Sequence, residues 1–152
     1  MIPENAFRFR VVGIPGPAGS KKPIFNKKLG RTILVDSGGA RTKRWRKAVT
    51  FDCFDAMDGA PKIRGPVCLY VEFVMPRPKN HFVAGDRARE LRDDAPAFHF
   101  QTPDEDKLVR STQDAMKGHA WDDDCQVCGL AVIKRWARPG EKPGADVAFW
   151  PA

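Results

Sequence analysis

The chain has 152 residues, a length that fits one domain of ordinary size built around a single hydrophobic core. Its 26 Lys and Arg residues outnumber its 19 Asp and Glu residues, and the resulting charge of +7 favours a polyanionic partner, with nucleic acid first among the candidates. The longest apolar run, VCLYVEFVM at residues 67–75, is far shorter than the roughly 20 residues of a membrane-spanning helix, and the first ten residues lack a signal peptide's apolar core, so we expect a soluble cytoplasmic protein.

The N-terminal part begins with a predicted strand. Residues 6–14 (AFRFRVVGI) alternate apolar and polar side chains with a period of two, which is typical of a strand with one polar face. A loop rich in Gly, Pro and Lys is expected over residues 15–30, where Lys21 and Lys22 are candidate contacts to an anionic partner. Another strand is predicted at residues 32–35.

A helix is predicted over residues 42–57, because apolar side chains recur there at helical spacing and Gly59 lies just beyond the end. Cations crowd its first turns, where they interact unfavourably with the helix dipole. An anionic partner would explain them, and a solvated polar face explains them equally well. They are Arg41, Lys43, Arg44, Arg46 and Lys47.

The middle of the chain contains a predicted buried strand at residues 66–76. A charged segment with little periodicity follows, and residues 77–96 are expected to form a mobile basic loop. Arg77 and Lys79 in this loop are further candidate contacts to the anionic partner.

The acidic residues are concentrated in one stretch, PDEDKLVRSTQDAMKGHAWDDD at residues 103–124. It holds seven acids against three bases, so its balance is −4 while the rest of the chain carries +11. A helix that begins near Asp106 would bury an apolar stripe and would end at Gly118. On that helix Asp106 and Arg110 share a face, and Asp104 lies in the turn that enters it.

Residues 122–124 add three carboxylates at the start of the next predicted strand, and a tight turn after Gly118 is expected to bring them back alongside the helix. Taken singly, each of these groups has an ordinary structural explanation: Asp104 or Asp106 as a helix cap, Arg110 as a surface ion-pair partner and residues 122–124 as a solvated turn. Taken together, two converging groups of carboxylates repel each other unless a cation lies between them, and Mg²⁺ prefers oxygen ligands of this kind.

Cys125 and Cys128 have the spacing of a zinc knuckle, but the four cysteines and three histidines offer no second close pair to complete a four-ligand site. We therefore expect both thiols to be small buried or half-buried fillers on a strand. That strand is predicted at residues 126–136, and residues 144–150 are expected to add a short edge strand. Strands and helices mixed without a βαβ rhythm predict one α+β domain over residues 1–152, with a mixed sheet packed against helices.

The stretch PDEDKLVRSTQDAMKGHAWDDDCQV resembles the central signature of the RusA-type Holliday junction resolvases, P-D-x-D-N-L-x-K, a helix ending in D-A-L-x-G, and then D-D-x-Q-V. GIPGPAGSKK resembles the family's N-terminal strand and G-x-P-x-x-K-x-R loop, and IKRW resembles its Lys-bearing strand. The resemblance implies a homodimeric, Mg²⁺-dependent endonuclease, with Mn²⁺ as a substitute, that resolves four-way DNA junctions by paired nicks during recombination and repair. It implies no small-molecule cofactor and no membrane.

Carried over by position, the family's metal-binding and catalytic aspartates fall on Asp104, Asp106 and Asp124, with Asp123 as the neighbouring metal-binding carboxylate. Its catalytic lysine falls on Arg110, which keeps the charge and can clamp a phosphate but does not readily give up a proton. The resemblance implies an electrostatic role for this guanidinium. The complete set of candidate DNA contacts is Lys21, Lys22, Arg77, Lys79, Lys107 and Lys134, where Lys107 replaces the family's Asn.

Two alternatives stay open. One is a non-catalytic nucleic-acid-binding module that uses the same basic surface, with the acids serving as caps and turns. The other is a metal-dependent nuclease that acts on flaps, forks or other branched DNA.

Overall fold

The computed structural model of the protein describes residues 1–36, 38–85 and 89–152. Helices and strands of the described parts occur in the following order: β1 (Phe7–Val12), β2 (Lys21–Asn26), β3 (Arg31–Asp36), α1 (Ala40–Met57), β4 (Val67–Met75), the short helix η1 (Lys79–His81), α2 (Glu105–Met116), the short helix η3 (Asp124–Gln126), β5 (Val127–Trp136) and β6 (Gly144–Pro151).

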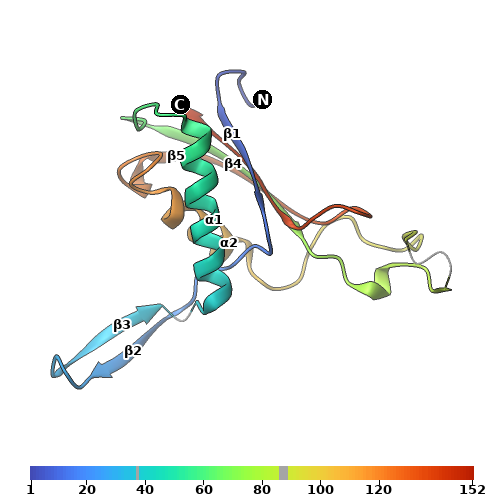
Figure 1. Cartoon of the computed structure of the whole chain (residues 1–152), viewed down its shortest axis with the longest axis horizontal. Helices are drawn as coiled ribbons and strands as arrows, with labels where there is room; N and C mark the ends of the chain where they lie inside the picture. The colour runs from blue at the N-terminus through green and yellow to red at the C-terminus, as the bar shows by residue number, and fades with distance from the viewer. Residues whose placement is uncertain (37, 86–88) are drawn as a thin grey trace.

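Four strands form one mixed sheet in the order β1-β6-β4-β5. The β1–β6 and β6–β4 pairs are antiparallel, whereas β4 and β5 are parallel and are connected through α2. In Figure 1 both helices lie against the same face of this sheet, and the β2–β3 hairpin extends away from it at the lower left. The chain is a single α+β domain, as the sequence predicts.

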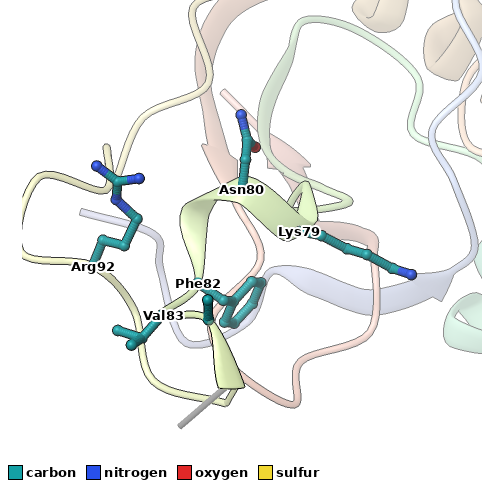
Figure 2. A pocket seen from close by; sticks show the side chains of 6 residues that line it. Lys79, Asn80, Phe82, Val83 and Arg92 are labelled. Carbon is teal, nitrogen blue, oxygen red and sulfur yellow. The ribbon is translucent and has the colours of Figure 1, made fainter. Parts of the chain in front are cut away.

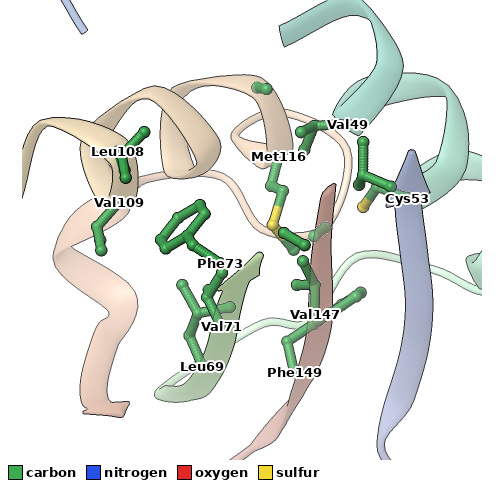
Figure 3. Packing of buried hydrophobic residues seen from close by; sticks show 14 of the residues in the cluster. Val49, Cys53, Leu69, Val71, Phe73, Leu108, Val109, Met116, Val147 and Phe149 are labelled. Atoms are coloured by element: carbon green, nitrogen blue, oxygen red, sulfur yellow. The ribbon is translucent and has the colours of Figure 1, made fainter. Parts of the chain in front are cut away.

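The core lies between the sheet and the two helices. Figure 3 shows Phe73 of β4 and Phe149 of β6 on the sheet below the two helices, which contribute Met116 of α2 and Val49 of α1. All four side chains are essentially inaccessible to solvent. The two helices are joined by a hydrogen bond from Trp45 Nε1 to Thr112 Oγ1 at 3.2 Å. The amphipathic patterns of both predicted helices therefore describe the packing correctly.

Strand β6 corrects one expectation, because it lies in the middle of the sheet and not at its edge. Its first residue, Gly144, approaches β1 so closely that a Cβ atom would lie 2.0 Å from the carbonyl oxygen of Val11. A pattern of apolar residues identifies a strand but carries no information on its neighbours, so the strand order could not be predicted.

The predicted loop at residues 15–30 was also partly wrong, since it contains β2. This strand pairs with β3 in register from Lys21↔Asp36 to Asn26↔Arg31. The turn is made by Asn26, whose side chain accepts hydrogen bonds from two backbone N–H groups, and by Gly30 at φ 60°. Cationic side chains on β2 hid the strand from a search for apolar alternation.

Two further expectations concern the CxxC motif and the segment at residues 77–96. Cys125 belongs to η3, not to a strand, and both Cys125 and Cys128 are exposed, so they are not fillers.

The described part of 77–96 contains η1 and an antiparallel bridge between Phe82 and Leu91; residues 86–88 lie outside the described parts. Among the described residues, no helix is long and apolar enough to cross a bilayer.

Candidate active site

The N-terminal end of α2 presents two carboxylates. Asp104 occupies the N-cap position with an extended backbone, φ −64° and ψ 144°, but its side chain makes no capping hydrogen bond. It is instead 3.1 Å from the Lys107 ammonium group, measured from Oδ2 to Nζ. Asp106 lies in the first turn, where a negative charge interacts favourably with the helix dipole. Capping therefore does not account for Asp104.

Arg110 lies one turn beyond Asp106, as the helical spacing predicts. Its Nη2 atom is 3.8 Å from Asp106 Oδ2, and about two thirds of each side chain is exposed, 62% for Arg110 and 67% for Asp106. Exposed ion pairs of this type contribute about 0.3–0.5 kcal/mol along a helix. The guanidinium and the carboxylate are thus both accessible to a third charged group.

Lys134 fixes the segment that leads into this site. Its ammonium group donates to the carbonyl oxygens of Gln101 and Pro103, each at 2.8 Å. The half-buried side chain thereby ties β5 to the residues immediately before Asp104. Lys134 was predicted as a DNA contact, and here its donors bind the protein's own backbone.

The glycine- and proline-rich segment at residues 15–18 forms the other side of the site. The backbone N–H of Ala18 donates to the carbonyl oxygen of Lys107 at 2.8 Å. From α1, Thr42 Oγ1 donates to the carbonyl oxygen of Pro17 at 2.6 Å, and the Arg41 guanidinium donates to that of Pro15 at 2.7 and 3.0 Å.

The sequence identified this segment through its resemblance to the family's N-terminal loop, but its contacts with α1 and α2 were not predicted. The segment also explains part of the cationic cluster on α1. Arg41 holds the segment, and Arg46 forms an ion pair with Asp114 of α2 at 2.8 Å. For these two residues the structure supplies a packing role inside the fold.

The second group of carboxylates surrounds η3. Asp123 is its N-cap, and its side chain accepts a hydrogen bond from the Cys125 N–H at 3.2 Å. This bond and the nearby Lys117 ammonium group lower the pKa of Asp123. Asp124 is half-buried, and its Oδ1 atom accepts from Trp121 Nε1 at 3.1 Å. The position of Asp123 is therefore explained by its role as a helix cap.

The two groups of carboxylates do not converge, contrary to expectation. The tight turn at Gly118 exists, with φ 82°, but it leads into η3 and β5 beyond the C-terminal end of α2. A helix of 12 residues, such as α2, is about 18 Å long at 1.5 Å per residue, which separates Asp104 from Asp124. Within the described parts of the chain, no three His, Cys, Asp or Glu side chains gather into a metal-binding group.

The remaining candidate DNA contacts lie on two extensions of the fold. Lys21 and Lys22 are exposed at the start of β2. Lys79 is exposed and lines a hollow in the 77–96 segment (Figure 2). None of the predicted metal-binding carboxylates lines this hollow. Arg77 is used by the fold, since it donates to the carbonyl oxygens of Ala137 and Pro96 at 2.7 and 2.9 Å.

A basic α+β domain that presents accessible carboxylates among cations at a helix N-terminus has the features of an enzyme that acts on nucleic acid. The family model described as Endodeoxyribonuclease RusA matches residues 15–148. The chain therefore belongs to the RusA endodeoxyribonuclease family, which confirms the resemblance seen in its motifs. No curated protein matches the chain.

Proposed function

We propose that this protein is a Mg²⁺-dependent, homodimeric endonuclease that resolves four-way DNA junctions by paired hydrolysis of phosphodiester bonds. The observation that carries the proposal is the pair of exposed carboxylates, Asp104 and Asp106, at the start of α2 in a chain of the RusA family. Asp104 in particular has no capping bond to explain it.

The donor chemistry of this pair fits Mg²⁺. The ion usually binds through one or two carboxylates, substrate phosphate oxygens and water, so a preformed cage of three carboxylates is not required. When bound, the metal would polarise the scissile phosphate and lower the pKa of an attacking water. Mn²⁺, which also accepts oxygen ligands, is expected to substitute.

The other charged side chains at the end of α2 have their own roles in the proposal. Arg110 would stabilise the charge that accumulates on the phosphate during hydrolysis, because a guanidinium binds phosphate oxygens well and stays protonated. Lys107 would exchange its partner Asp104 for a DNA phosphate. Both cations lie within 4 Å of a carboxylate, so neither needs a large movement.

Asp124 would be supplied to each site by the second subunit of the dimer. A junction has two equivalent strands to cut, which suits an enzyme with two-fold symmetry. Since α2 separates Asp124 from Asp104 within one chain, Asp124 can join the carboxylate pair only if a partner subunit supplies it. This arrangement would reconcile the predicted three-aspartate site with the observed separation.

Mixed dimers test the arrangement. A dimer of one Asp106→Asn chain and one Asp124→Asn chain keeps a complete site only if each site combines both subunits. We expect such mixtures to regain nicking of one strand, while each variant alone is inactive. If the mixtures stay inactive although subunits exchange, the site belongs to one chain.

The substrate is tested directly by incubating the purified protein with labelled duplex, flap, fork and four-way junction DNA in Mg²⁺. We expect symmetric nicks in the junction and little cleavage of the duplex. Preferential cutting of flaps or forks would support the alternative nuclease. Binding without any cleavage in either Mg²⁺ or Mn²⁺ would support the non-catalytic module.

A further inference from the structure

The hairpin formed by β2 and β3 is an arm that stands apart from the rest of the fold (Figure 1). Five of the six residues of β2 are exposed. An isolated two-stranded hairpin is only marginally stable in water unless a third strand or another surface packs on it. The arm therefore has the properties of a segment that is completed by a partner.

Large apolar side chains are exposed on this arm. Phe25 is 61% exposed and Leu34 is 66% exposed. The register places Leu34 opposite Pro23, and Pro23 lies on the same face as Phe25 because side chains alternate along a strand. Ile24, at 51% exposure, lies on the opposite face, and Leu29, at 57%, lies in the turn. An apolar patch on a projecting arm is typical of a binding surface.

The charge of the arm identifies the kind of partner. Residues 21–36 carry five cations and one acid, Asp36; the cations are Lys21, Lys22, Lys27, Lys28 and Arg31. Such an arm is attracted to a polyanion. Apolar side chains between cations suit DNA whose bases are accessible, because bases stack on aromatic rings while cations bind the backbone.

The position of the arm connects it to the candidate active site. Ala18, three residues before β2, is hydrogen-bonded to the backbone of Lys107, within the same two turns as Asp104, Asp106 and Arg110. The residues before the arm are held against α1 by Thr42 and Arg41. The base of the arm is thus fixed to the end of α2 that presents the carboxylates.

We propose that the β2–β3 arm reads DNA structure by placing Phe25 and its apolar neighbours against bases left open at a branch point, while Lys27 and Lys28 hold the flanking phosphates. Apolar side chains that enter between base steps are an established means of recognising distorted DNA. Intact duplex offers no open base, so the arm would favour branched DNA. The inference rests on the proposed function and specifies how its substrate is selected.

Binding in EDTA separates this inference from the cleavage chemistry. We expect Phe25→Ala to weaken binding to a four-way junction on the order of tenfold, as expected for a lost base stack, while duplex binding is unchanged. The fluorescence of 2-aminopurine placed at the branch point should change when the parent binds and should not change with Phe25→Ala. The matched control, Lys27→Ala with Lys28→Ala, should weaken both substrates and make the salt dependence shallower by about two phosphates.

Equal affinity of Phe25→Ala and the parent for junctions would overturn the inference, even if the parent cuts junctions in Mg²⁺. Light scattering that shows Phe25→Ala as a monomer and the parent as a dimer would also overturn it, since the arm would then be a subunit contact. A parent that prefers junctions but never cleaves them would contradict the proposed function alone. Thermal melting checks folding, which should be unaffected because Phe25 lies outside the core.

Discussion

The backbone N–H of Ala18 and the carbonyl oxygen of Lys107 are joined by a hydrogen bond of 2.8 Å, although 89 positions separate the two residues in sequence. This bond attaches the base of the β2–β3 arm to the first turns of α2. The same hydrogen bond therefore positions the arm, which we propose to bind DNA, and the helix end that carries Asp104 and Asp106, which we propose to be catalytic.

Gly16 tests how strongly this anchor depends on close packing. A Cβ atom at Gly16 would lie 2.8 Å from the Thr42 Cα and 2.9 Å from the Arg41 carbonyl oxygen, which are backbone atoms that cannot easily move. Gly16→Ala should lower the free energy of unfolding by about 1–3 kcal/mol, as overpacking does. Gly39→Ser is the control, because a Cβ at Gly39 meets nothing within 4 Å. Urea unfolding that shows no difference between them would contradict the anchor.

Lys134 is expected to position Asp104 and not to bind DNA. Lys134→Met leaves the carbonyl oxygens of Gln101 and Pro103 without their charged donor, which should cost about 1–3 kcal/mol of stability and reduce the cleavage rate. The salt dependence of junction binding should stay the same. If the plot of log affinity against log salt concentration became shallower by the equivalent of about one phosphate contact, Lys134 would instead be a DNA contact. Lys22→Met, on the exposed arm, should show the reverse behaviour.

Arg110 tests whether positive charge alone is sufficient at this position. Arg110→Gln should reduce cleavage by about 10²-fold, the usual effect of removing one group that stabilises transition-state charge. Arg110→Lys keeps the charge and should retain most of the rate. Single-turnover assays in Mg²⁺ measure both. Parental rates for Arg110→Gln would limit this residue to its weak ion pair with Asp106.

The acid stability of the fold should depend on Glu141, which is not part of the carboxylate pair. Hydrogen bonds from Arg135 at 2.6 and 2.8 Å, together with the Arg138 N–H, lower the pKa of Glu141 to about 2 from an ordinary value of 4.5. A lowered pKa in the folded state stabilises the protein above pH 4.5, and this contribution is lost as the pH falls toward 2.

Urea unfolding at pH 6 and at pH 3 should therefore show a stability advantage of the parent over Glu141→Gln that narrows with acid. A difference that is the same at both pH values would show that the carboxylate gains nothing from its charge in the folded protein.

The elements of this fold could be predicted where each has a pattern of its own. The apolar stripe from Leu108 to Met116 defines α2, and the buried run at residues 67–75 defines β4. The central place of β6 could not be predicted, because it depends on long-range pairing that is made possible by Gly144. β2 escaped notice because Lys21 and Lys22 occupy positions where a buried strand would have apolar side chains.

The candidate site was predictable in its local part only. Helical spacing correctly placed Asp106 next to Arg110. Helical spacing could not predict that Asp124 lies away from Asp104, because the direction of the chain after Gly118 follows from the pairing of β5 with β4. Lys134 carries a charge that suggested DNA binding, whereas its backbone partners are visible only in three dimensions.

Asp106→Asn separates binding from chemistry most directly. The side chain is 67% exposed, so the change should leave the fold intact, while the loss of one negative charge weakens metal binding and relieves repulsion of the phosphate. The control is Asp114→Asn, the same change on the same helix beside Arg46. We predict that Asp106→Asn binds four-way junctions in EDTA at least as tightly as the parent, and nicks them in Mg²⁺ more slowly by orders of magnitude, while Asp114→Asn cuts normally. Near-parental cleavage by Asp106→Asn would contradict the catalytic role of the carboxylate pair and favour a module that only binds DNA.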